Sequence, residues 1–202
     1  PISGGAAPNG HTLLFTTATI AVNTTLMGKS MKFSAVNDLE PVSLISSSPL
    51  VLVINDKFPA KTVKELIDYA RSNPGKVNAG VNTPGSTSHL SAEMLKQLAK
   101  IDPAIIPYKG GGPSMAAVVS GEVQFLFATA PTAAPQLKSG RIRALAVTTA
   151  KKSPAFPDLP TMSSVIPGFE SDNWYAMFFP KKTPKEIVAR MNAEIKIGRA
   201  HV

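Results

Sequence analysis

The chain has 202 residues, 44% of them hydrophobic, and a formal net charge of +8. This length is enough for one core of good size or two small ones. The absence of cysteine excludes a disulfide framework, a thiolate zinc site and a cysteine nucleophile. The three histidines lie far apart in the sequence, so we expect no metal site. We expect no cofactor either.

The positive charge does not indicate a nucleic-acid-binding protein. Lysine and arginine are scattered along the chain, and adjacent pairs occur at Lys151-Lys152 and Lys181-Lys182. We therefore expect no nucleic-acid partner. No apolar run reaches the roughly 18 residues that a membrane span needs, so no membrane insertion is expected either. A mildly basic surface suits a protein that collects small anions.

Strand and helix patterns alternate along the chain, which predicts an α/β fold. Short apolar runs bounded by glycine, proline, asparagine or serine predict seven strands, over 13–17, 50–54, 77–81, 104–108, 123–128, 142–148 and 175–179. Several runs are apolar at consecutive positions, as in strands covered on both faces. This pattern favours a largely parallel sheet with helices on either side.

Sequence signals at their ends predict four helices, which open at Thr62, near Ser88, at Gly112-Pro113 and at Thr183. Thr62 and Glu65 have the spacing of a capping box, and Thr183 and Glu186 repeat it with Pro184 at the first helical position. Gly121 is expected to end the third helix.

Two loops have the composition of anion-binding turns. Tyr108-Lys109-Gly110-Gly111-Gly112 joins a strand to a helix, so its backbone N–H groups should face the end of the strand, with Lys109 as a possible counter-charge. Gly85-Ser86-Thr87-Ser88 places hydroxyl groups at another helix start. Open α/β sheets bind ligands at this edge. The alternative is an ordinary tight turn with a surface lysine.

The patterns of common enzymes are incomplete. Residues 80–87 have the glycine spacing of a phosphate loop but serine in place of its lysine. No G-x-S-x-G motif is present, so the serine of such a motif is missing. We therefore expect no catalytic residues, although a hydrolase or transferase using Lys109 or His89 stays open as an alternative.

Eight sequence blocks in one order resemble the Bug family, the solute-binding receptors of tripartite tricarboxylate transporters. They occupy 8–14, 38–44, 73–76, 85–90, 107–111, 120–124, 139–147 and 158–161. Further matches at 167–170, Trp174 and 180–184 extend the resemblance over nearly all of residues 8–196.

The resemblance implies the type II periplasmic-binding-protein fold, with two lobes joined by hinge crossings and truncated at both ends. Residues 1–49 would be part of domain 1, 50–172 domain 2, and 173–196 the return into domain 1. The last six residues resemble the translation of a sequencing adapter, so 197–202 are expected to be a non-native tail.

For function, the resemblance implies a bacterial periplasmic receptor that captures a small organic anion, a di- or tricarboxylate or a related carboxylate, for membrane permease subunits. A ligand-presenting co-receptor for a membrane sensor kinase is the alternative. Carried over position by position, the ligand-binding residues would be Thr16, Thr17, Ala18, Thr19, Gly85, Ser86, Thr87, Ser88, Tyr108, Lys109, Gly110, Gly111, Ala128 and Thr129.

Overall fold

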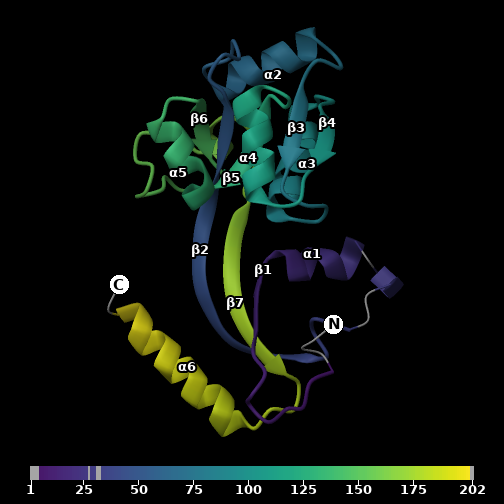
Figure 1. Ribbon diagram of the computed structural model, residues 1–202, viewed down its shortest axis with the longest axis vertical. Helices are drawn as coiled ribbons and strands as arrows, with labels where there is room; N and C mark the ends of the chain where they lie inside the picture. The colour runs from purple at the N-terminus through teal and green to yellow at the C-terminus, as the bar shows by residue number, and fades with distance from the viewer. Residues whose placement is uncertain (1–4, 27, 31–32, 201–202) are drawn as a thin grey trace. The chain divides into compact units, whose positions relative to one another are not determined.

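The computed structural model describes residues 5–26, 28–30 and 33–200. Two compact units are present: unit 2 is Ser48–Asn173, and unit 1 takes its described residues from the segments before and after it. Strands β2 (Leu39–Asn55) and β7 (Asp172–Pro180) carry the chain from one unit into the other (Figure 1).

The sheet of unit 2 is mixed. Strand β3 (Asn78–Val81) is parallel to both β4 (Ala104–Pro107) and β5 (Phe125–Thr129). Strand β2 is antiparallel to β5 and to β6 (Ile142–Val147). The expected parallel sheet is thus right for β3, β4 and β5 and wrong for β2. Consecutive apolar residues indicate burial on both faces. Strand β2 is covered by helices on both faces and has this pattern, although it runs antiparallel to its neighbours.

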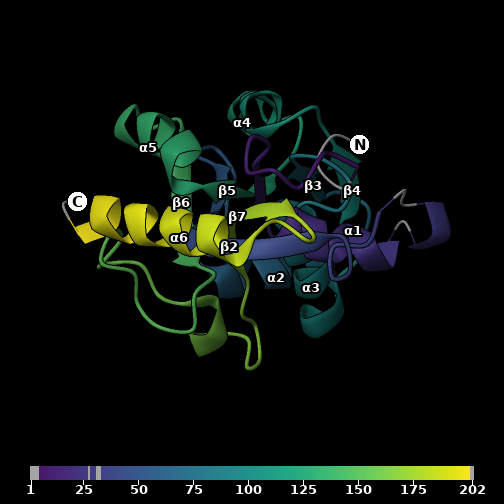
Figure 2. The ribbon, with the colours of Figure 1, turned by 90° about the horizontal axis from the view of Figure 1, so that it is seen from below.

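Helices cover both faces of this sheet. Figure 2 shows α4 (Gly111–Ser120) and α5 (Ala130–Lys138) on one face, and α2 (Val63–Ser72) and α3 (Thr87–Ala99) on the other. Alternate residues of β2 enter two core clusters: Leu52 and Ile54 join the one under α2 and α3, whereas Val51 and Val53 join the one under α4 and α5.

Local capping confirms the predicted starts of α2 and α3. The Thr62 hydroxyl accepts from the backbone N–H of Glu65 at 3.1 Å. The Glu65 carboxylate reaches back to the N–H of Lys61 at 2.7 Å, one residue before the cap. At α3, Ser86 is the cap, accepting from the N–H of His89 at 3.2 Å. A short 3₁₀ helix, η2 (Met162–Ser164), is capped in the same way by Thr161.

Polar contacts fasten the loops of unit 2. Gly121 ends α4 in the left-handed conformation, as predicted. The buried amide of Asn55 donates to the carbonyl oxygens of Val118 and Val119 at 2.7 and 3.0 Å, which satisfies the end of α4.

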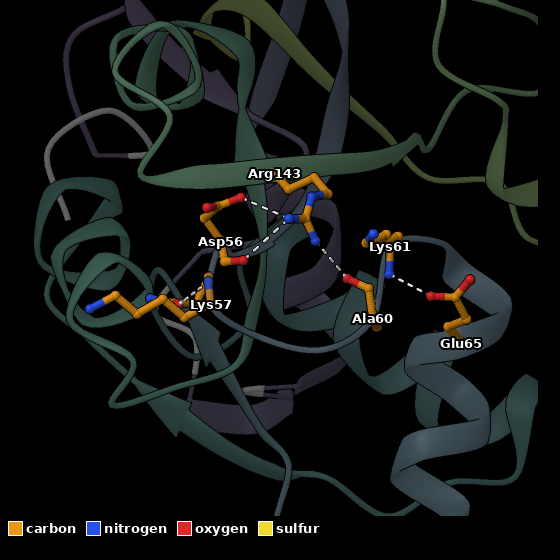
Figure 3. Close-up of polar contacts among 7 residues, drawn as sticks. Asp56, Lys57, Ala60, Lys61, Glu65 and Arg143 are labelled. Atoms are coloured by element: carbon orange, nitrogen blue, oxygen red, sulfur yellow. Dashed lines mark hydrogen bonds and ion pairs between the residues drawn. The ribbon is translucent and has the colours of Figure 1, made fainter.

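Figure 3 shows the contacts that join Arg143 of β6 to the loop before α2. Its guanidinium donates to the Asp56 carboxylate at 2.8 Å and to a carbonyl in the same loop.

In unit 1, strand β1 (Leu14–Thr17) pairs antiparallel with β7, and α1 (Thr19–Leu26) and η1 (Gly28–Ser30) follow it. Helix α1 was not predicted, because its sequence TIAVNTTL is rich in β-branched residues, which are poor helix formers. An ion pair of 2.8 Å joins Lys181 to Glu40 of β2.

The last helix, α6 (Lys185–Ala200), corrects the predicted capping box. The Thr183 hydroxyl donates to the carbonyl of Pro180 at 2.7 Å, and the carbonyl of Pro184 accepts from the N–H of Val188. Pro184 therefore precedes the first helical residue. The expected non-native tail, 197–202, is helical as far as Ala200, and residues 201–202 lie outside the described residues. Within the described chain, no helix combines the length and apolar character needed to cross a bilayer.

Candidate functional site

Three helices of unit 2 begin at one edge of its sheet. Helices α3, α4 and α5 follow the carboxyl ends of β3, β4 and β5, which point the same way. The first N–H groups of a helix have no partner within it, and its dipole places partial positive charge there. We call this region the helix-start edge and define it by residues 82–88, 110–114 and 128–132.

At α3, the predicted hydroxyl groups have different surroundings. The Ser86 hydroxyl donates to the carbonyl of Thr83 at 2.7 Å in addition to capping the helix. The Thr87 hydroxyl donates to Oδ1 of Asn173 at 3.1 Å. The Ser88 hydroxyl is buried, with 2% of the residue exposed, and has no partner among the described residues. Only Ser88 therefore keeps its hydroxyl unengaged.

At α4, backbone groups face the edge. The N–H of Gly110 donates to the carbonyl of Asn82 at 2.8 Å, so Gly111 and Gly112 carry the first N–H groups without a helical partner. A Cβ atom at Gly111 would lie 3.3 Å from Oγ1 of Thr132, so a side chain at this position would crowd that hydroxyl. The chain thus keeps the backbone accessible where α4 begins.

The Tyr108 side chain of this loop points away from the edge. The Tyr108 hydroxyl donates to Glu122 at 2.7 Å, beyond the opposite end of α4. Burial and the Glu122 carboxylate raise the pKa of Tyr108 to about 12. The backbone N–H of Tyr108 is also engaged, with the carbonyl of Val81. Lys109 is exposed and forms no ion pair with any described residue.

At α5, the two residues predicted to bind ligand, Ala128 and Thr129, have different surroundings. Ala128 is 1% exposed and packs in the core with Val51, so its side chain is not at the edge. The Thr129 hydroxyl is hydrogen-bonded to the Thr132 hydroxyl at 2.9 Å. Of this pair, Thr132 is the residue whose hydroxyl lies beside Gly111.

Three residues of the edge were missed from the sequence: Asn82, Ser114 and Thr132. The Ser114 hydroxyl donates to Oδ1 of Asn82 at 2.7 Å, which leaves the amide nitrogen of Asn82 as a donor. Their positions in the sequence could have indicated them, because Asn82 directly follows β3 and Ser114 lies in the first turn of α4.

Residues 16–19, which were predicted to bind ligand from domain 1, belong to unit 1. Thr16 and Thr17 end β1, the buried Ala18 is in a turn, and Thr19 begins α1. The Thr17 hydroxyl donates to Oγ1 of Thr19 at 3.1 Å, and the N–H of Ala18 donates to the carbonyl of Trp174 at 3.2 Å. This loop is therefore a helix start held by its own hydroxyl groups.

The helix-start edge contains no charged side chain in its three segments. Its polar groups are backbone N–H groups, hydroxyls and one amide. Among the described residues, no three histidine, aspartate or glutamate side chains gather where a metal ion could bind. Such a surface can hold an anion through neutral donors, as helix N-termini do.

A family model described as the tripartite tricarboxylate transporter family receptor, TctC, matches residues 3–199. The chain belongs to this family. Among TctC relatives, BugT of Bordetella pertussis is 34% identical over 193 residues, which cover 94% of this chain and 59% of BugT. The predicted membership of the Bug family is thus confirmed.

Solved TctC-type structures confirm the predicted periplasmic-binding-protein fold. Rpa4515 of R. palustris, solved with adipate, superposes with a TM-score of 0.89 at 34% identity, covering 96% of this chain and 65% of that one. MatC (Rpa3494) of Rhodopseudomonas palustris, solved with bound malate, has a TM-score of 0.86 at 31% identity, covering 96% and 66%. The chain thus spans less than two thirds of each of these relatives.

Proposed function

We propose that this chain is part of a periplasmic receptor that binds a small organic carboxylate at the helix-start edge, for uptake by a tripartite tricarboxylate transporter. The observation that carries the proposal is the buried Ser88 hydroxyl, which lies in the first turn of α3 and has no partner among the described residues. A buried polar group without a partner costs about 1–3 kcal/mol, so a ligand that accepts from it gains affinity.

Carboxylate fits the chemistry of the edge. Its oxygens only accept hydrogen bonds, and the edge offers the N–H groups of Gly111 and Gly112, the Ser88 hydroxyl and the Asn82 amide. Each hydrogen bond to a charged group contributes about 1.5–3 kcal/mol. Two family members were solved with the dicarboxylates adipate and malate, which supports the same ligand class here.

The family description also supports the proposed partners, the membrane permease subunits of the transporter. In unit 1, the start of α1 at Thr16–Thr19 is the proposed second set of ligand contacts, because it is also a helix N-terminus that follows a strand. The match to a receptor family and the similar binding proteins solved with ligands favour a receptor over the hydrolase or transferase alternative.

Calorimetric titration with adipate, malate and the neutral adipamide tests the proposal. We expect both dicarboxylates to bind and adipamide not to bind. Ser88→Ala should weaken dicarboxylate binding about three- to tenfold, because it removes one hydrogen bond to a charged group. Ser72→Ala, on the exposed end of α2, is the matched control and should bind as the unaltered protein does. Failure of both dicarboxylates to bind, or equal binding of adipamide, would refute the proposal.

A further inference from the structure

We infer that His89 is a positioning residue of the carboxylate site: its neutral imidazole holds the turn before α3, and protonation of the imidazole releases that turn and weakens binding. The inference rests on the proposed function, since it concerns the same edge. His89 follows Ser88 in the first turn of α3, three residues after the capping Ser86, and its ring accepts a hydrogen bond from the backbone of Gly85.

The contact between His89 and Gly85 fixes the tautomer of the ring. The backbone N–H of Gly85 donates to Nδ1 of His89 at 3.0 Å. An imidazole nitrogen can accept only when it carries no proton, so the proton of the neutral ring is on Nε2. Nε2 faces the Glu93 carboxylate at 3.6 Å, one helical turn further along α3. The backbone and Glu93 therefore select the same neutral tautomer.

Gly85 needs this support because its backbone is unusual. It adopts φ +74°, which favours glycine, and it is buried at the start of the turn. The turn is closed by Ser86, whose N–H and hydroxyl both engage Thr83. The hydrogen bond to His89 adds a tie from the helix back to the residue before the cap. Together these contacts set the direction of the Thr87 and Ser88 N–H groups.

Protonation reverses the role of Nδ1. A doubly protonated imidazolium has only donors, so Nδ1–H would oppose the N–H of Gly85 and break the tie. The added positive charge would by itself attract an anion, but the Glu93 carboxylate beside Nε2 offsets it. Residues 171–173 pack against the same helix and bring Asp172, and no acid other than Glu93 lies within ion-pair distance of His89 among the described residues. We therefore expect the loss of the Nδ1 acceptor to outweigh the added positive charge, so that protonation of His89 weakens anion binding.

The experiment compares His89→Ala with His89→Asn, whose Oδ1 can take the place of Nδ1 as acceptor. With adipate as the probe at pH 7.5, we expect about a three- to tenfold loss of affinity in H89A and a change of less than about twofold in H89N. As the pH falls to 5.5, the affinity of the unaltered protein should fall relative to that of H89N. Protonation of adipate itself affects both proteins equally, so it cancels in this comparison. Hydrogen exchange without ligand should show Gly85 N–H protected in the unaltered protein and in H89N, and exposed in H89A.

The possible failures are distinguishable. If adipate binds but H89A binds it as tightly as the unaltered protein, or if affinity rises toward pH 5.5 relative to H89N, the role of His89 is refuted while the proposed function stands. If no protein binds adipate or malate at any pH, the proposed function and this inference both fail. The exchange of Gly85 N–H reports the tie itself, independently of any ligand.

Discussion

The hydroxyl of Ser114, in the first turn of α4, donates at 2.7 Å to Oδ1 of Asn82, which follows β3. The same hydroxyl lies 3.0 Å from the carbonyl of Gly110 and 3.1 Å from that of Gly111. This contact joins two of the loops that form the helix-start edge. It also decides which end of the Asn82 amide is free, because an engaged Oδ1 leaves Nδ2 to donate.

Ser114→Ala should therefore weaken dicarboxylate binding by about 0.5–1.5 kcal/mol, because the Asn82 amide loses the hydrogen bond that orients it. Ser120→Ala is the matched control, since its hydroxyl donates only within α4, to the carbonyl of Ala117 at the far end of the helix. Calorimetry with adipate should separate the two variants. Equal affinities would show that the orientation of Asn82 does not matter for binding.

Gly111→Val tests the close approach of backbone and ligand. The new Cβ would lie 3.3 Å from Oγ1 of Thr132 and 3.9 Å from Nδ2 of Asn82, so the valine side chain would crowd two polar groups of the helix-start edge. We expect at least about a tenfold loss of adipate affinity, with the fold intact by circular dichroism. A Cβ at Gly112 meets nothing within 4 Å, so Gly112→Val should cost less. The reverse order of the two affinities would contradict the described geometry.

Asn55→Ala tests the polar anchor at the other end of α4. The variant leaves the carbonyl groups of Val118 and Val119 without their side-chain donor, and the lost contacts should lower the free energy of unfolding by about 1–3 kcal/mol. Denaturant unfolding measures this difference. Asn37→Ala, at an exposed position of unit 1, is the control and should change stability by less than about 0.5 kcal/mol.

Asp172 should make stability depend on pH. Burial, and to a lesser extent the charge of Glu170, raises the pKa of Asp172 in the folded protein. The unfolded chain then loses this proton at a lower pH, so the contribution of Asp172 to stability falls as the pH rises through the interval between its unfolded and folded pKa values.

Asp172→Asn should remove that loss, so the variant should gain stability relative to the unaltered protein as the pH rises above the unfolded pKa of Asp172. Unfolding by denaturant at several pH values measures the difference. Asp158→Asn, at an exposed position, is the control. A difference between Asp172→Asn and the unaltered protein that stays constant or shrinks over this range would contradict the assigned burial.

Tyr108 should titrate late. Its pKa of about 12 implies that the neutral hydroxyl stabilises the fold below pH 10 and that this contribution is lost as the pH rises from about 10 to 12. Ultraviolet titration should show an ionisation near pH 12 that disappears in Tyr108→Phe. Because the hydroxyl binds Glu122, away from the helix-start edge, Tyr108→Phe should leave adipate affinity unchanged within about twofold.

Local sequence determined the helix starts best. Thr62 caps α2 and Ser86 caps α3 through partners three residues away, so the information lies within one turn of the chain. The same reasoning failed at Thr183, whose hydroxyl found the carbonyl of Pro180 instead. Serine and threonine hydroxyls have several backbone groups within reach, and packing decides among them.

The sequence by itself also indicated two anion-binding loops, because glycine and hydroxyl residues followed apolar strands. Only the tertiary structure decided which of their groups are free. Thr87 is engaged by Asn173, 86 residues away in the chain, while the neighbouring Ser88 is left without a partner among the described residues. Likewise, the Tyr108 hydroxyl turns to Glu122 while the backbone of Gly111 faces Thr132. Local patterns fix conformation over one turn, but a side chain's partner depends on which distant segments the fold brings beside it.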